Sequence, residues 1–189
     1  MTQHNFLATT KLLFDYYKLL GEKAIDQVKS EELLNWHSHE NSNSMVQIVR
    51  HLSGNMISRW TDFLTSDGEK TWRNRDNEFE DLILTKEELL LCWSKGWDVF
   101  FTTYDNLKEE DLVKTIYIRN QGHSVQEAIL RQLAHYSYHI GQLVYLAKLL
   151  VGEDFVSLSI PKNHSEAYNE KHQERKDDNF FAKDILQNK

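Results

Sequence analysis

A run free of charged side chains in the second half of this sequence most constrains its fold. Residues 132–147 include no Asp, Glu, Lys or Arg, and apolar residues fall on every side of a helix drawn through them. A helix on a protein surface has a polar face, so a helix without one is expected to lie among neighbours that cover it. The run contains two histidines and two glutamines, and it is too short to cross a bilayer, which takes about 20 apolar residues. We therefore predict a helix enclosed by other helices of the chain.

Three more segments have the apolar period of helices that can cover this one. They are residues 5–28, a segment that begins at Ser44 and stops at Asp67-Gly68, and residues 85–106. The sequence also contains three candidate capping boxes, in which two side chains three residues apart each bond to the other's backbone N–H at a helix start. The pairs are Ser44 with Gln47, Thr85 with Glu88, and Ser124 with Glu127. The last pair begins the helix that holds the uncharged run, which we expect to reach residue 151.

The connections are expected to contain little regular structure. Residues 30–43 read as a polar loop, and residues 115–119 alternate apolar with polar side chains, as a brief strand or extended connection does. Glycine (7) and proline (1) are scarce, which disfavours an all-β fold because its turns depend on these residues. The predicted fold class is all-α, a four-helix bundle over residues 1–162. A charged tail over residues 163–189 follows, whose Phe180, Phe181 and Ile185 can dock back onto the bundle.

Charge and cysteine content restrict the partners and the compartment. A net charge of −7 without a basic stripe argues against a nucleic-acid partner, because such proteins neutralise phosphates with clustered Lys and Arg. The single cysteine, Cys92, cannot form an internal disulfide, and we interpret it as a buried thiol in a reducing compartment. The first residues lack the pattern of a signal peptide. We predict a cytoplasmic protein with no membrane segment.

Three histidines form the candidate chemical site. His135 and His139 are four residues apart in the uncharged helix, so their side chains lie on one face with Cβ atoms about 5–6 Å apart. Two imidazoles at this spacing can bind one ion at about 2.0–2.1 Å. A third ligand must come from a facing helix, and His51 is the candidate because the other histidines lie at helix ends, in loops or in the tail. Burying two ionisable groups is costly unless they are neutral and hydrogen-bonded, or bind something.

A simpler interpretation also fits these residues. An H-x3-H pair occurs by chance on helices, and buried histidines often hydrogen-bond only to backbone or tyrosine. His51 shares its helical stripe with small polar side chains, which suits either the wall of a wet cavity or a solvated surface; they are Ser44, Gln47, Asn55 and Ser58. Imidazole ligands suit zinc, nickel, copper and iron alike. Neither His135 nor His139 has a glutamate three residues before it, so a carboxylate di-iron site is not predicted.

The segments around these histidines resemble the DinB/YfiT-like superfamily of metalloenzymes, which includes bacillithiol S-transferases and relatives of mycothiol-dependent maleylpyruvate isomerase. The resemblance covers most of the chain. It is strongest at SMVQIVRHLSGNMISRWTDFLTSDGEKTWRNRDNEFE and SVQEAILRQLAHYSYHIGQLVYLAKLL, and SIPKNHSEAYN is similar to one uncharacterised branch. The resemblance implies a four-helix bundle, often a homodimer. It also implies one divalent metal ion, held by the histidines that correspond to His51, His135 and His139.

The resemblance implies a metal-dependent enzyme that acts on a small-molecule substrate. The first hypothesis is a thiol S-transferase, in which a divalent ion, zinc or nickel, keeps a low-molecular-weight thiol deprotonated for attack on an electrophile. Tyr138 and Gln142 are candidates to orient groups in the site. Trp72, Arg73 and Arg75 are candidates to bind an anionic thiol cofactor, and a salt-bridged structural loop is the alternative for the arginines. A metal-dependent hydrolase, and a helical binding or stress-response module with a structural metal, remain open for the whole protein.

Overall fold

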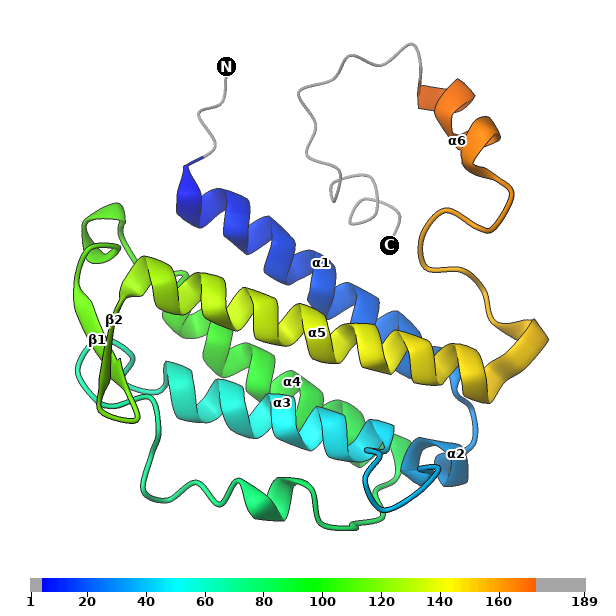
Figure 1. Cartoon of the computed structure of the whole chain (residues 1–189), viewed down its shortest axis with the longest axis horizontal. Coiled ribbons are helices and arrows are strands. Elements are labelled where there is room, and N and C mark those ends of the chain that lie inside the picture. The colour runs from blue at the N-terminus through cyan, green and yellow to red at the C-terminus, as the bar shows by residue number, and fades with distance from the viewer. Residues whose placement is uncertain (1–4, 173–189) are drawn as a thin grey trace.

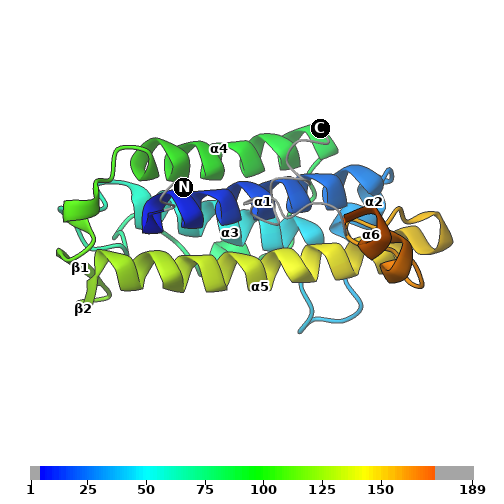
Figure 2. The same ribbon diagram turned by 90° about the horizontal axis from the view of Figure 1, so that it is seen from above.

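Four long helices lie side by side along the length of the molecule (Figures 1 and 2). The computed structural model describes residues 5–172. The long helices are α1 (Phe6–Gln27), α3 (Met45–Trp60), α4 (Lys86–Tyr104) and α5 (Val125–Val151). The shorter elements are α2 (Glu31–Asn35), α6 (Ser165–His172), the 3-10 turns η1 (Asp76–Glu78), η2 (Glu109–Asp111) and η3 (Gly152–Asp154), and the strands β1 (Thr115–Ile118) and β2 (Gln121–Ser124). The described chain is mostly helical, as predicted.

The helix starts follow the predicted side-chain caps. The boxes at the starts of α3 and α4 form in full. Only half of the third box forms: Ser124 Oγ accepts from the Glu127 N–H at 3.1 Å, while a Glu127 carboxylate oxygen lies 3.2 Å from His123 Nδ1. A carboxylate drawn towards the imidazole is turned away from the backbone N–H of the cap, which explains the difference from the prediction.

The second predicted helix is shorter than its sequence pattern indicated. α3 ends at Trp60, and Asp62 has a φ of 50°, a left-handed conformation through which no α-helix continues. The predicted stop at Asp67-Gly68 is therefore wrong. The prediction of a loop throughout residues 30–43 is also wrong, because this segment contains α2, whose N-cap is Ser30.

A β-hairpin joins α4 to α5 at one end of the molecule (Figure 1). Ile116 and Ile118 of β1 are buried and alternate with exposed residues, as predicted. Arg119 and Asn120 both have positive φ, the geometry of a tight two-residue hairpin turn. Sequence analysis missed the partner strand β2, because its residues QGHS have little preference for strands.

Aromatic side chains from all four long helices meet in the core. Phe14 of α1 and Phe100 of α4 have ring centroids 4.5 Å apart, and Trp60 of α3 lies 4.7 Å from Phe100. Tyr136 of α5 is fully buried, and its hydroxyl accepts a hydrogen bond from Trp60 Nε1 at 2.9 Å. A buried tyrosine hydroxyl needs such a partner. This bond fixes the rotation of α5 against α3 and so sets the direction of His135 and His139 on the same helix.

The helix α5 is not enclosed, contrary to the prediction from its uncharged sequence. Figure 2 shows it on one side of the molecule, opposite α4. Its outward face carries exposed hydrophobic side chains: Leu130, Tyr138, Tyr145 and Leu149. The prediction is wrong because the described part of the chain supplies neighbours for the inner face of α5 alone. An apolar outer face on a helix needs no cover from its own chain if another molecule covers it.

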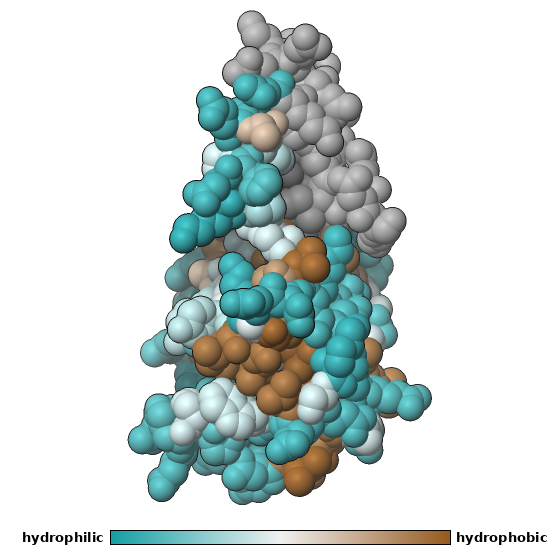
Figure 3. Space-filling view, turned by 90° about the vertical axis from the view of Figure 1, so that its right-hand side faces the viewer, coloured by the Kyte–Doolittle hydropathy of each residue, from teal (hydrophilic) through white to brown (hydrophobic). Residues whose placement is uncertain are grey.

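The end of the molecule near α2 also has a hydrophobic surface. Figure 3 looks onto the end at the right of Figure 1 and shows hydrophobic side chains between hydrophilic ones. Trp36, Leu82 and Ile83 are exposed near α2 and help to line a cavity of about 610 Å³. The predicted docking residues of the tail, Phe180, Phe181 and Ile185, lie outside the described residues. Among the described helices, none is long and apolar enough to span a membrane.

Candidate metal centre

His51, His135 and His139 come together between α3 and α5. Their candidate ligand nitrogens all lie within 4.8 Å of one another. His51 Nε2 is 3.1 Å from His135 Nε2, and the ring centroids of His51 and His139 are 4.8 Å apart. Nitrogen ligands at about 2.0–2.1 Å from one tetrahedral ion are separated by about 3.4 Å. Small side-chain adjustments would therefore bring all of these nitrogens to one ion, and the three histidines could hold a metal.

Hydrogen bonds behind two of the rings leave their Nε2 atoms for a ligand. His51 Nδ1 lies 2.9 Å from Glu78 Oε2, and His139 Nδ1 lies 3.1 Å from Gln142 Oε1. Both oxygens accept hydrogen bonds, so each Nδ1 carries the proton and each Nε2 keeps its lone pair. Metal-binding histidines in proteins are generally oriented in this way by a carboxylate or carbonyl oxygen. The donor set therefore fits a divalent ion.

Glu78 in the loop after α3 fixes the ring of His51. Arg73 donates to it twice, from Nε to Oε1 at 2.8 Å and from Nη2 to Oε2 at 2.9 Å. Burial alone would raise the pKa of Glu78, but the hydrogen bonds from His51 and Arg73 outweigh burial and hold this pKa below its usual value. The carboxylate is therefore ionised and can attract both the imidazole N–H and the guanidinium.

Sequence analysis did not find Glu78, although α3 carries one signal for it. A Cβ atom at Gly54 would overlap the Glu78 carboxylate, so glycine makes room for the loop. Glycine inside a helix costs about 0.5–1 kcal/mol relative to alanine, and it can mark a close approach of another segment. Gly54 lies three residues after His51 and so points to a neighbour of that histidine.

Burial keeps the imidazoles of His135 and His139 in the form that binds metals. Burial, with the neighbouring His139 and His51, lowers the pKa of His135 to about 3. Burial also lowers the pKa of His139 to about 4. Metal ions bind the neutral ring, because protonation occupies the lone pair. Both rings therefore need no deprotonation near neutral pH to accept an ion.

The histidines open into a cavity of about 450 Å³. This volume suits a small molecule. Five arginines line the cavity, and none of its described lining residues is acidic. The arginines are Arg59, Arg73, Arg75, Arg119 and Arg131.

Residues 1–164 match the family described as "Protein of unknown function (DUF1572)". This chain belongs to the DUF1572 family. The match includes both α3 and α5, so it contains the three histidines as well as Glu78. No curated protein and no solved structure matches the chain.

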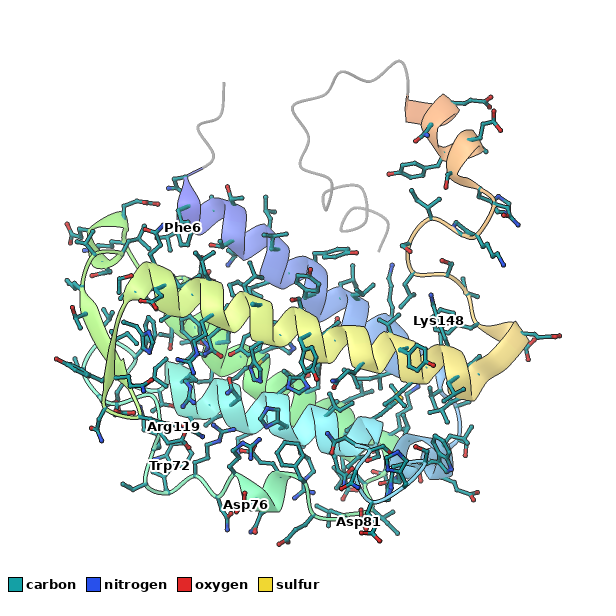
Figure 4. All side chains as sticks on the ribbon, viewed as in Figure 1. Phe6, Trp72, Asp76, Asp81, Arg119 and Lys148 are labelled. Carbon is teal, nitrogen blue, oxygen red and sulfur yellow. The ribbon has the colours of Figure 1, made fainter. Side chains whose placement is uncertain are left out.

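The predicted cofactor-binding residues of this DUF1572 chain differ in their surroundings. Trp72 is 59% exposed and is not among the residues that line the cavity (Figure 4). Arg73 lines it but is tied to Glu78 and lies 3.7 Å from Glu69, as expected for a salt-bridged loop. Arg75 also lines the cavity and is about half exposed. Of the three, Arg75 is best placed to meet a ligand.

The predicted orienting residues both lie at the site of the DUF1572 chain. Gln142 contacts His139 as described above. The ring of Tyr138 lies 4.9 Å from that of His139, and Tyr138 also lines the cavity. The tyrosine is 64% exposed, so it forms part of the cavity edge.

The polar stripe of α3 is buried, so the interpretation of it as a solvated surface is wrong. Gln47 Nε2 donates to Phe79 O at 2.7 Å, and Ser58 Oγ donates to Gly68 O at 2.7 Å. Asn55 faces the cavity between these two attachments. The stripe thus binds the loop of residues 61–85 at its ends and lines the cavity at its centre.

Proposed function

We propose that this DUF1572 chain is a divalent-metal-dependent enzyme whose ion is bound by His51, His135 and His139. The observation that supports this most is the convergence of three imidazoles from two helices at the wall of a polar cavity. Three nitrogen ligands leave a coordination position open, as catalytic zinc sites do and closed structural sites do not. Zinc and nickel are the proposed ions, since both accept imidazole ligands.

The fold proposed for the chain is the four-helix bundle of the DinB/YfiT-like superfamily. The arrangement of α1, α3, α4 and α5 and the positions of the histidines on α3 and α5 support this assignment. A homodimer in the cytoplasm is part of the same proposal. The exposed hydrophobic face of α5 supports it, because surfaces of this kind often mark protein interfaces.

The proposed reaction is the transfer of a low-molecular-weight thiol to an electrophilic carbon. A divalent cation at the three histidines would supply the positive charge that keeps the thiol deprotonated near neutral pH. The sulfur forms a bond to the carbon, the leaving group departs with the electron pair of the broken bond, and the thiol proton passes to solvent. The protein's own residues orient the histidine rings: Glu78 bonds to the Nδ1 of His51, and Gln142 bonds to the Nδ1 of His139.

Elemental analysis of protein purified without a polyhistidine tag tests the metal assignment. We expect one divalent ion per chain in the native protein and its loss in His135→Ala. The matched control is His123→Ala, because His123 lies in the hairpin outside the histidine cluster. A tightly held ion in purified His135→Ala would show that the ligand assignment is wrong.

The alternative enzyme is a metal-dependent hydrolase, in which water is the nucleophile. Hydrolysis is helped by a general base, and among the described residues that line the cavity none is a carboxylate. We therefore rank thiol transfer first. Incubating the metal-loaded protein with thiols and an electrophile, and separately with ester and amide panels, distinguishes the two reactions.

The non-catalytic alternative is a helical binding or stress-response module with a structural metal. It predicts that chelation lowers the melting temperature while no thiol or ester is turned over. Turnover that disappears on chelation and returns with added zinc or nickel would contradict it.

A further inference from the structure

The cavity beside the histidines is positively charged, although the whole chain has a net charge of −7. Arg59 and Arg73 are nearly buried in its wall, whereas Arg75 and Arg119 are about half exposed. A low-dielectric wall strengthens the field of the charges that face into it. The site thus collects positive charge in an otherwise acidic protein.

The two carboxylates next to Arg59, Arg73 and Arg119 are too few to neutralise all three arginines. Glu69 is shared, since its Oε2 lies 3.1 Å from both Arg59 and Arg119 and 3.7 Å from Arg73. Glu78 serves Arg73 and also His51. Two negative charges, on Glu69 and Glu78, therefore face the guanidinium groups of Arg59, Arg73 and Arg119.

The two remaining arginines have weaker partners. Arg75 lies 3.9 Å from the carboxylate of Asp76, which is almost fully exposed, so solvent screens this pair. Arg131 is exposed, and its guanidinium lies 3.2 Å from His123 Nε2, a ring nitrogen without negative charge. Both arginines line the cavity, and these partners neutralise their positive charges poorly.

Two buried carboxamides stand next to the histidines on the cavity wall. Asn55 follows His51 by four residues and Gln132 precedes His135 by three, so each lies one helical turn from a histidine. Asn55 Oδ1 and Gln132 Oε1 are shielded from solvent and accept no hydrogen bond from the described residues. Leaving such a group unpaired is unfavourable. Both unpaired atoms are oxygens that accept, so a ligand in the cavity can satisfy them with a donor such as a hydroxyl, amide or thiol hydrogen.

We propose that this cavity binds a small anion through Arg75, Arg119 and Arg131, and that Asn55 and Gln132 hydrogen-bond the same ligand next to the histidines. The ligand class is a small molecule with a carboxylate or phosphate group. Guanidinium groups bind these planar or tetrahedral oxyanions through paired, charge-assisted hydrogen bonds. This proposal rests on the proposed function, and it implies that the end of the thiol remote from sulfur is negatively charged.

A matched series of thiols tests the charge preference. The probes are 3-mercaptopropionate, 2-mercaptoethanol and cysteamine, which are similar in size and end in a carboxylate, a hydroxyl and an ammonium group. Calorimetric titration of the zinc-loaded protein gives each affinity, and the absorption of the cobalt-loaded protein reports sulfur bound to the ion. We expect the carboxylate thiol to bind about tenfold tighter than the neutral one, and the ammonium thiol to bind weakest.

The intrinsic chemistry of these thiols works against the expected order. An ammonium group lowers the pKa of a nearby thiol and a carboxylate raises it, so cysteamine forms thiolate most readily. A preference for the carboxylate thiol must therefore come from the protein. Arg75→Gln and Arg131→Gln should each reduce that preference several-fold. Lys148→Gln, which removes one positive charge from α5 outside the cavity, should leave it unchanged.

A second arm uses succinate and inorganic phosphate, which contain no sulfur, with metal-free as well as zinc-loaded protein. It distinguishes carboxylate from phosphate ligands and tests the arginines without the thiol hypothesis. If all thiols bind equally and neither anion binds, the anion site is overturned while thiol transfer stands. If no thiol binds but an anion does, with loss in the arginine variants, the anion site stands and thiol transfer fails. If nothing binds, both are overturned.

Discussion

Glu78 is the residue through which the loop acts on the histidines. It holds His51 and Arg73 at the same time, and its charge is kept by both. Replacement by glutamine removes that charge and leaves the nearly buried guanidinium of Arg73 with less compensation. We expect Glu78→Gln to lower zinc affinity by about 10–100-fold, the usual effect of losing a residue that orients a ligand. Competition with a coloured chelator measures the change.

The matched control for this experiment is Glu80→Gln in the same loop. Glu80 is exposed and contacts α3 through its backbone oxygen, which accepts from Arg50 Nη1 at 2.6 Å. The control should bind zinc as the native protein does. Equal affinity in both variants would mean that the carboxylate does not orient His51.

Two glycines should respond oppositely to alanine. A Cβ at Gly54 meets the Glu78 carboxylate, which two partners hold in place, so Gly54→Ala should displace the loop and weaken zinc binding. Gly141 on the outer face of α5 has no atom of the described residues within 4 Å of its Cβ position, and Gly141→Ala should stabilise the protein by about 0.5–1 kcal/mol. Denaturant unfolding and zinc titration of both variants check the contrast. Unchanged zinc affinity in Gly54→Ala would contradict the close approach of the loop.

The sequence indicated the histidines but not the residues that support them. His135 and His139 could be predicted because helical spacing alone brings them together, and His51 because it lies inside a helix. Glu78 lies 27 residues from His51 in a loop without a period, so no spacing rule connects them. Whether the side-chain oxygens of Asn55 and Gln132 have hydrogen-bond partners depends on their neighbours in the packed structure. The sequence alone does not show those neighbours.

Among the elements, the hairpin is attached to the loop after α3 at Asp67, Gly68 and Glu69. Asp67 accepts hydrogen bonds from the backbone N–H groups of Arg119 at 2.9 Å and Asn120 at 2.8 Å. Burial is the largest single influence and raises the pKa of Asp67, but these two bonds and one from the Glu69 N–H together lower it below its usual value. A folded pKa below the unfolded one means that the stabilisation is present above about pH 4 and is lost as the pH falls further.

The variant Asp67→Asn tests whether the charge of this carboxylate stabilises the protein. This variant keeps one acceptor oxygen but cannot ionise, so it should be less stable than the native protein at pH 7. The difference in melting temperature should shrink as the pH is lowered from 7 to 3, because the native carboxyl becomes increasingly protonated over this range. Thermal unfolding at the two pH values measures it. A difference that is the same at both would show that the charge of Asp67 plays no part.

The elements were predictable where local chemistry determines them. Two capping boxes fixed the starts of α3 and α4, and α5 ends at Val151 as expected. The end of α3 was not predictable, because apolar residues continue past Trp60 into a turn whose geometry depends on Asp62. The strand β2 was missed for a similar reason: its pairing with β1 comes from the turn between them and not from its own residues.

For the molecule as a whole, a metal ion would connect α3 to α5. An ion that binds the folded chain alone stabilises it by about 2.7 kcal/mol at a free concentration 100 times its Kd. We expect zinc or nickel to raise the melting temperature of the native protein and to leave that of His135→Ala unchanged. Scanning calorimetry with and without the ion checks this. An equal rise in both proteins would place the ion elsewhere.

The outward hydrophobic face of α5 can determine how whole chains associate. If two copies pack through this face, Tyr145→Glu should convert dimers to monomers, since it places a charge among apolar side chains. Tyr117→Glu, a change at a similarly exposed tyrosine in the hairpin, is the control. Sedimentation of both variants gives the answer, and a dimer that survives Tyr145→Glu would exclude this face.

The attachment of Glu78 to a loop, and not to a helix, has a consequence for the order of assembly. The three histidines are in place once α3 and α5 have packed, but His51 receives its orienting carboxylate only when residues 61–85 have closed over α3. During refolding, helical content should therefore return before the tight uptake of zinc. An ion captured early would be held loosely by the rings and would become slow to exchange when the loop closes, so the rate of metal release would time the final step of folding.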